Sequence, residues 1–319
     1  MCRTGKIMLL LSVTVLALVS CRSNQAAKKM GYCFDAAFDA DSSRLYITAG
    51  QAGLHVLDVD EQGRLNYVST HYAGGYYRNI KLQAGCAYIA GTDLPGLLVL
   101  DTAEDPPVSK WSRNGHGMGI YMEVNTLYLV DADSGLYIFD ISNPESPGEL
   151  AQFESLEQPW DVWVHQGIAY VADKNKGMVA IDVTTSAEPR QIGFVTWDER
   201  DPMAEIIRGE GHFAYIAAGK HGLVIIDVSD PTHPVVAAAY DPGADSFGEG
   251  LFVKDNIAYL AIGDKKNHQE NGLHILDVFN PYSPAVISIL PFEDWVEGVF
   301  VAGNYAFVAN TYSGVRSID

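Results

Sequence analysis

One pattern of hydrophobic and polar positions recurs along the whole chain. A glycine is followed by four mostly apolar residues and an aspartate, as in GLVIID at 222–227. Versions of this phrase begin at seven glycines: Gly53, Gly96, Gly135, Gly177, Gly222, Gly272 and Gly314. A spacing of roughly 40–50 residues, with several short apolar runs in each unit, is typical of propeller blades.

Three further apolar runs accompany most of these phrases. In the fifth repeat AYIAA (214–218) comes before the phrase and VVAAAY (235–240) after it, while the sixth repeat shows GLFVKDN (250–256) at its start. No window sustains an apolar period of 3.6 residues, which excludes a helical solenoid. The sequence therefore predicts an all-β fold, a seven-bladed β-propeller of four-stranded antiparallel blades that spans residues 33–319.

The repeated phrase has a physical interpretation. Gly222 falls in a hairpin that often requires a positive φ, and the apolar residues after it are expected to be buried on both faces between neighbouring blades. Asp227 ends the strand, where its carboxylate can accept backbone N–H groups of the next turn. We therefore assign a structural role, not a catalytic one, to the seven aspartates at this position: Asp58, Asp101, Asp140, Asp182, Asp227, Asp277 and Asp319.

At this point a family resemblance appears. The stretch GLVIIDVSDP (222–231), with AYIA (214–217) before it, resembles the LVIVD repeat family of bacterial and archaeal envelope proteins. The plan is also similar to that of YVTN and WD40 propellers. The resemblance spans residues 33–319 and implies the architecture, but it implies little about activity.

The seventh repeat departs most from the pattern. Arg316 and Ser317 stand where other repeats have apolar residues, and the sequence stops at Asp319, before a fourth strand. Residues 22–32 are too polar to be expected to supply that strand. Either the last blade has three strands, or the sequence is a shortened version of a longer one.

The N-terminus carries an export signal. Arg3 and Lys6 precede an apolar run at 7–19, which predicts a signal peptide over residues 1–20. Residues 18–21 (LVSC) resemble the lipobox of bacterial lipoproteins, which implies that Cys21 is lipidated and that residues 21–32 form a tether. Several acyl chains, at about 0.8 kcal/mol per buried CH₂, anchor a protein stably. The alternative is an ordinary cleaved signal.

The implied location is the cell envelope, with the lipid on Cys21 holding the chain to a membrane. Arg22 follows Cys21, which by analogy with Gram-negative lipoproteins indicates the outer membrane. The formal net charge of −19 disfavours nucleic acid as a partner, although solubility alone also explains it.

Cysteine and histidine positions give weaker indications. Cys33 and Cys86 fall at different points of their repeats, so two buried thiols are expected and a disulfide is not. His55 and His274 share one repeat position, which we interpret as a surface position on a strand and not as a metal site.

The strongest candidate site comes from the entry to each innermost strand. Counted back from the second strand, the aligned residues include three glutamates on consecutive blades, one arginine and neighbouring aspartates, which we expect to ring one mouth of the central channel: Glu205, Glu249, Glu297, Arg78, Asp161 and Asp35. Met118 and Trp160 take the same place in blades 3 and 4. The glutamates would repel one another unless a cation, a basic ligand, Arg78 or raised pKa values neutralised them. The alternative is a water-filled rim.

Catalytic signatures are absent from the sequence. It contains no GxSxG, HExxH, CxxC or P-loop pattern. We therefore expect a non-enzymatic scaffold that binds a protein or a glycan through the propeller faces. The alternative is a propeller hydrolase or lyase that works from the channel mouth with a divalent cation held by carboxylates. The inserted loop at 263–272 is a second candidate for recognition.

Overall fold

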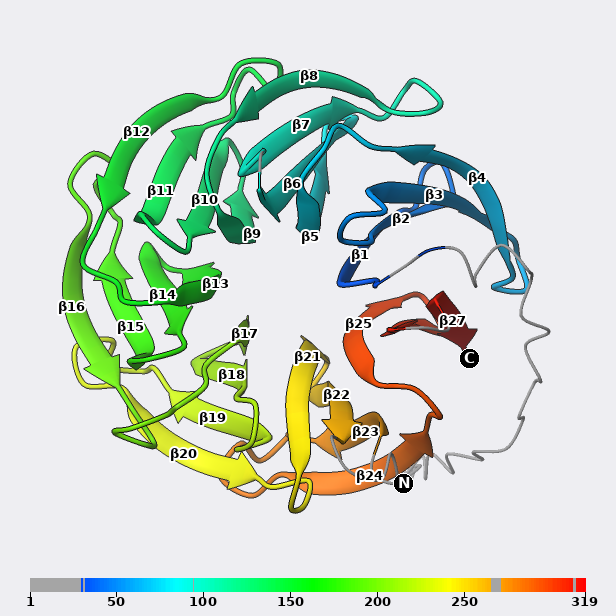
Figure 1. Cartoon of the computed structure of the whole chain (residues 1–319). Helices are drawn as coiled ribbons and strands as arrows, with labels where there is room; N and C mark the ends of the chain where they lie inside the picture. The colour runs from blue at the N-terminus through cyan, green and yellow to red at the C-terminus, as the bar shows by residue number, and fades with distance from the viewer. Residues whose placement is uncertain (1–29, 31, 94, 265–270, 312–313) are drawn as a thin grey trace, which may run out of the picture.

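Each sequence repeat folds into one antiparallel sheet, and the sheets form a closed ring (Figure 1). The structure is a computed structural model, and it describes residues 30, 32–93, 95–264, 271–311 and 314–319. Within these residues six sheets have four strands, the seventh has three, and no helix occurs. The predicted seven-bladed propeller is confirmed, and its last blade has three strands in the described part of the chain.

The strands follow the predicted phrases closely. The innermost strands are β1 Asp35–Asp39, β5 Tyr76–Gln83, β9 Gly117–Glu123, β13 Pro159–His165, β17 Ile206–Glu210, β21 Ser246–Lys254 and β25 Val296–Ala302. The second strands are β2 Arg44–Thr48, β6 Cys86–Thr92, β10 Thr126–Asp131, β14 Ile168–Asp173, β18 Phe213–Ala217, β22 Ile257–Asp264 and β26 Tyr305–Asn310. The third are β3 Leu54–Val59, β7 Leu97–Asp101, β11 Gly135–Asp140, β15 Gly177–Asp182, β19 Leu223–Asp227, β23 Gly272–Asp277 and β27 Gly314–Ile318. The outer strands are β4 Leu65–His71, β8 Val108–Arg113, β12 Gly148–Phe153, β16 Arg190–Val195, β20 Val235–Tyr240 and β24 Ala285–Pro291.

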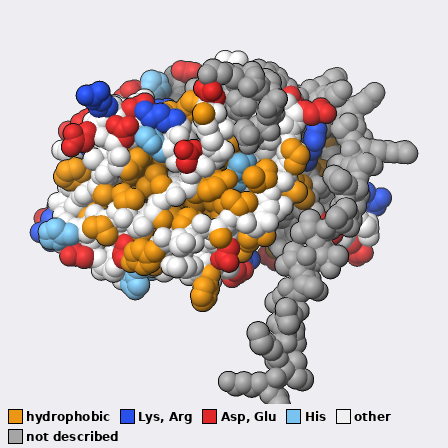
Figure 2. All heavy atoms as spheres, turned by 90° about the horizontal axis from the view of Figure 1, so that it is seen from below, with side chains coloured by type: hydrophobic (Ala, Val, Ile, Leu, Met, Phe, Trp, Pro, Cys, Tyr) orange, Lys and Arg blue, Asp and Glu red, His pale blue; other side chains and the backbone are white. Residues whose placement is uncertain are grey.

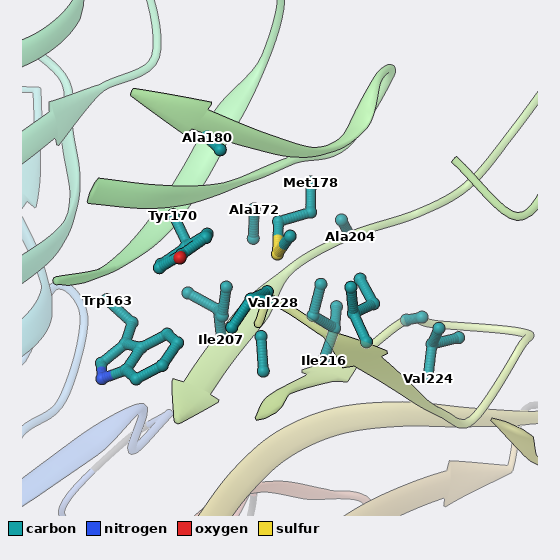
Figure 3. Close-up of a cluster of buried hydrophobic side chains, with 13 residues drawn as sticks. Trp163, Tyr170, Ala172, Met178, Ala180, Ala204, Ile207, Ile216, Val224 and Val228 are labelled. Carbon is teal, nitrogen blue, oxygen red and sulfur yellow. The ribbon is translucent and has the colours of Figure 1, made fainter. Parts of the chain in front are cut away.

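The third strand of each blade is apolar on both faces because both faces are covered. In β19, Leu223 and Ile225 pack into a cluster shared with blade 6, while Val224 and Ile226 pack into a cluster shared with blade 4. Figure 3 shows the cluster between blades 4 and 5. Burying each such side chain contributes about 1.5–3 kcal/mol, so every interface between blades carries part of the stability of the ring.

Gly222 and the aspartate after it behave as predicted. Gly222 has a φ of +67°, and a Cβ there would lie 2.3 Å from the carbonyl oxygen of Tyr240. The backbone N–H of Ser229 donates to Asp227 Oδ1 at 2.9 Å. The equivalent bond, from the residue two places on, occurs at four more repeats: Asp101, Asp140, Asp182 and Asp277. The repeated carboxylate therefore organises a turn.

The ring closes between blade 7 and blade 1 by side-chain contacts. The rings of Phe38 and Phe307 stack at 6.2 Å, and Ser317 Oγ donates to the carbonyl oxygen of Gly63 at 2.7 Å. Met30 and Cys33 are buried in the same cluster. Within the described residues, blades 1 and 7 share no strand.

The buried thiols are confirmed, but the prediction for the two histidines is wrong. Cys33 and Cys86 are buried and not joined by a disulfide, and burial raises the pKa of Cys33 to about 12. His55 and His274 are also buried, because the third strand is covered on both faces. Both ring nitrogens of His55 have internal partners, Thr70 Oγ1 at 2.6 Å and the Met30 carbonyl at 3.0 Å, and Nδ1 of His274 lies 2.9 Å from Tyr240 Oη.

The outer strands have a different environment from the third strands. Valine and isoleucine side chains of β20 and β24 remain exposed, among them Val235, Val286 and Ile287. Figure 2 looks at the flank formed by blades 5 and 6 and shows bands of hydrophobic side chains across it. The outer strand thus covers the blade and presents its own apolar side chains to solvent.

Several predictions concern segments outside the described residues. The signal peptide at 1–20, Cys21 and most of the tether at 21–32 belong to these, as do residues 265–270 of the inserted loop. In the part of the chain that is described, no helix is long and apolar enough to cross a membrane.

Candidate functional site

One residue of each blade projects into the channel where the innermost strand begins. In β21 the pairing register passes from Gly248 to Gly250, so Glu249 is left out of the ladder as a β-bulge. A bulge turns a side chain out of the alternation of its strand. The register skips the equivalent residue in blades 2, 3, 4 and 7 as well.

These bulged positions and their equivalents in blades 1 and 5 converge on one cavity of about 330 Å³. We call them the rim residues, and the cavity the mouth cavity. In blade order the rim residues are Phe34, Arg78, Met118, Trp160, Glu205, Glu249 and Glu297. Their backbones are far apart in sequence but occupy the same place in each blade, so the ring itself brings the side chains together.

The structure brings together five of the six residues predicted for the mouth. Arg78, the three glutamates and Asp35 line the cavity, whereas Asp161 is 1% exposed and is not among the lining residues. In blade 1 the rim position belongs to Phe34, and Asp35 is the next residue. Sequence reasoning did not find Phe34, Lys174 or Arg208, which also line the cavity.

Charge is divided unevenly around the mouth cavity. Blades 5, 6 and 7 contribute the three glutamates, so one arc of the rim is acidic. Blades 1 to 4 contribute Phe34, Met118 and Trp160, together with Arg78 and with Asp35 and Lys174, which are already paired with Lys81 and Glu205. Arg208 of blade 5 also lines the cavity but is paired with Asp161. A ligand in the cavity therefore meets mainly carboxylates on one side, and on the other apolar surface with the guanidinium of Arg78, which makes no ion pair within the described residues.

Glu205 is neutralised within the protein. Its side chain is nearly buried, and Lys174 Nζ donates to Glu205 Oε1 at 2.6 Å. The ammonium of Lys174 also lies 4.3 Å from the centre of the Trp160 ring. This charge-assisted hydrogen bond compensates the charge of one of the three glutamates, and so reduces the repulsion that was expected among them.

Arg78 is held by aromatic rings and not by an acid. Its guanidinium carbon lies 5.5 Å from the ring centre of Phe34, 5.3 Å from Tyr76 and 5.4 Å from Trp160. In the described part of the chain Arg78 makes no ion pair, and its Nε is buried without a hydrogen-bond partner. Burial lowers the pKa of Arg78, but an arginine stays charged.

Glu297 is an uncompensated carboxyl group on the opposite arc. It is partly buried and makes no hydrogen bond or ion pair within the described residues. Burial raises its pKa to about 7, the charge of Glu205 adds to the rise, and Arg78 opposes it. Arg78 and Glu297 thus face the same cavity with opposite charges and do not touch.

The residue after the rim position ties neighbouring blades together. Asp161 accepts the backbone N–H of Ile207 at 3.2 Å and the guanidinium of Arg208 at 2.5 Å, both from blade 5. Burial raises the pKa of Asp161, and Arg208 opposes that rise. The carboxylate of Asp161 therefore holds a blade interface and supports Arg208 at the cavity wall.

Blades 1, 2 and 3 are joined in the same way. Asn79 Nδ2 donates to Asp35 Oδ2 at 2.8 Å, and the backbone N–H of Ile120 donates to Asn79 Oδ1 at 3.2 Å. The carboxylate of Asp35 also accepts the N–H of Ile80 at 3.2 Å. Asp35, the acid predicted in blade 1, thus makes structural hydrogen bonds to blade 2 and also lines the cavity.

The acidic groups do not form a metal cluster. Among the described residues no three His, Cys, Asp or Glu side chains lie close enough to hold an ion. Glu205 is paired with Lys174, and Asp161 with Arg208. The arrangement at the mouth is therefore one of separate charges around a cavity.

Comparison with known proteins agrees with this architecture. The profile of the LVIVD repeat matches residues 114–154, 158–196, 203–242, 249–290 and 296–315, together more than half of the chain. Among curated proteins no match is found.

Solved structures share the fold at low sequence identity. The WD40 β-propeller domain of Doa1 superposes with a TM-score of 0.68 at 12% identity, covering 91% of this chain and 93% of that one. The computationally designed protein Ika8 superposes with a TM-score of 0.64, also at 12% identity, covering 90% and 96%. At this identity the likeness concerns the fold alone.

Proposed function

The chain belongs to the LVIVD repeat family, and from that premise we propose that it is a lipid-anchored, non-enzymatic binding scaffold of the cell envelope. Its ligand, a group on an envelope protein or glycan, enters the mouth cavity. The observation that carries the proposal is that Arg78 and Glu297 line one cavity with opposite charges, and that neither makes an ion pair with another described residue.

The cavity has the features of a preformed site. Small-molecule sites are concave, mostly apolar, and carry a few polar groups that converge. Here Phe34, Met118 and Trp160 give apolar surface, and the rim residues lie at the start of the innermost strands, which line the centre of the ring. Such a site binds without first having to fold a loop.

The anchor follows from the sequence. Cys21 ends the segment that resembles a lipobox, and the propeller is packed from Met30 onward. The eight intervening residues, 22–29, span at most about 3.3–3.6 Å each. A lipid on Cys21 would therefore keep the propeller within about 30 Å of the membrane surface.

One observation favours the alternative of a hydrolase or lyase. With a pKa of about 7, Glu297 has the proton affinity expected of a general base at neutral pH. The same rise in pKa follows from burial beside Glu205, and Glu205 and Asp161 are already paired. Binding explains the raised pKa and the paired acids without requiring a catalytic step, so it is the function that we favour.

The proposal is tested with the full-length chain in a Gram-negative host. The protein should fractionate with membranes, and Cys21→Ser should release it. Purified envelope fragments should change the fluorescence of Trp160, whose indole lies in the mouth, and Trp160→Phe should remove that change. Replacing Glu205, Glu249 and Glu297 together with Gln should abolish binding. Unchanged binding in that variant, or a Cys21→Ser protein that stays with membranes, would contradict the proposal.

A further inference from the structure

We propose that the mouth cavity recognises an amino-carboxylate group, in which an ammonium and a carboxylate lie a few bonds apart. The proposal rests on the proposed function of the mouth and names the chemistry of its ligand. The carboxylate would lie against Arg78 and the ammonium against Glu297, with the carbon atoms between them.

The first step of the argument is the arginine. The chain has 40 acidic residues and 21 basic ones, so a half-buried cation that makes no ion pair among the described residues is unexpected. Arg78 is such a cation, because three aromatic rings take the positions where a carboxylate would otherwise lie. The remaining guanidinium nitrogens of Arg78 face the cavity side of the rings without an ion-pair partner among the described residues. A ligand carboxylate can accept hydrogen bonds from such nitrogens with charge assistance.

The second step is the acidic arc. Glu297 has no hydrogen-bond partner in the described chain, and it stands in line with Glu205 and Glu249 on adjacent blades. Lys174 already compensates Glu205, so within the described residues Glu297 is left without an ion pair. An ammonium supplies a positive charge there and donates up to three hydrogen bonds. The raised pKa of Glu297 agrees with a carboxyl group that lacks its counter-ion.

The third step excludes ligands with one charge or none. A simple cation would meet Arg78 and Lys174, and a simple anion would meet three glutamates across the same cavity. A neutral sugar would leave both Arg78 and Glu297 uncompensated. A ligand with both charges satisfies both sides and adds no net charge to the site.

The cavity also limits the size of the ligand. A volume of about 330 Å³ is near the lower end of the range for small-molecule sites. Phe34, Met118 and Trp160 offer apolar contact to a short carbon chain. The chemistry fits a free amino acid or the amino-carboxylate end of a longer chain.

The test is a titration of the full-length mature protein with matched probes, by calorimetry and by Trp160 fluorescence. Leucine carries both charges, 4-methylpentanoate lacks the ammonium, and 3-methylbutylamine lacks the carboxylate. We expect leucine, in at least one enantiomer, to bind tenfold or more tightly than either analogue. Tighter binding of Nε-acetyllysine than of leucine would identify a chain end as the ligand, and the reverse would identify a free amino acid. Both results support the proposal.

Two variants separate the charges. Arg78→Gln should weaken leucine tenfold or more and leave the amine analogue unaffected, whereas Glu297→Gln should weaken leucine and leave the carboxylate analogue unaffected. Exposed Glu293→Gln is the control and should bind leucine as the wild type does.

Failure of this proposal can be told apart from failure of the proposed function. If one analogue binds as tightly as leucine and is lost in the corresponding variant, the amino-carboxylate is wrong and the mouth remains a site. If none of the probes binds, the amino-carboxylate is again wrong, and the mouth is judged by the response of Trp160 to envelope material.

Discussion

The proposed binding chemistry depends on Arg78 and Glu297, two side chains that make no ion pair within the described residues. Glu205 and Asp161 are paired with Lys174 and Arg208, as acids in a folded protein normally are. Arg78 and Glu297 are not, although both face the mouth cavity. The difference has a physical cause, since aromatic rings separate Arg78 from the acids and burial favours the neutral form of Glu297.

The carboxyl group of Glu297 should make stability depend on pH. Its pKa in the folded chain, about 7, is above the unfolded value of about 4.5, so folding favours the protonated form. The stabilisation is fully present below pH 4.5 and is lost as the pH rises through 7. The loss amounts to at most about 3 kcal/mol.

Glu297→Gln should therefore be more stable than the wild type at pH 8 and lack this part of the pH slope. Urea denaturation at several pH values between 5 and 8 measures the effect. Exposed Glu293→Gln should keep the wild-type slope. Parallel curves for the wild type and Glu297→Gln would show that Glu297 is not buried as described.

At the scale of the element, the β-bulge decides which residues line the mouth cavity. Because of the bulge, the rim residue has no partner in the strand pairing, and the side chain of the next residue forms hydrogen bonds to the neighbouring blade. Trp160 and Asp161 show this division, since the first lines the cavity and the second holds blade 5.

The link between blades 1, 2 and 3 can be tested at one residue. Asn79→Ala removes the acceptor of the buried N–H of Ile120 and a donor to Asp35. At about 1–3 kcal/mol for each unsatisfied group, we expect a loss of about 2–4 kcal/mol. Asn66→Ala, on the exposed surface of β4, should change stability by less than about 0.5 kcal/mol. Equal urea midpoints for the two variants would show that the link is unimportant.

The sequence predicted much of this element-scale order, because the bulge lies at a constant distance before the second strand in most blades. Counting back located Arg78, Trp160 and the glutamates correctly. It failed in blade 1, where the turn at 40–43 is longer than the turn at 84–85 of blade 2, so Phe34 was missed. The partners Lys174 and Arg208 were missed too, because their contacts join residues 31 and 47 positions away.

At the scale of the whole molecule, the ring converts a repeat into a site. Seven equivalent positions placed around one axis enclose a cavity whose lining comes from all seven blades. The periodic phrase predicted this ring and its number of blades. It could not predict the closure, since Phe38, Phe307, Met30 and Cys33 meet only when the first and last repeats come together. Family membership likewise identifies the architecture and leaves the ligand to the rim residues.

The most direct test of the account is a high-resolution crystal structure of the mature protein grown with saturating leucine. The account predicts density in the mouth cavity, with the ligand carboxylate hydrogen-bonded to the guanidinium of Arg78 and the ammonium to Glu297. Water alone in the cavity, or leucine bound at another place on the propeller, would contradict it.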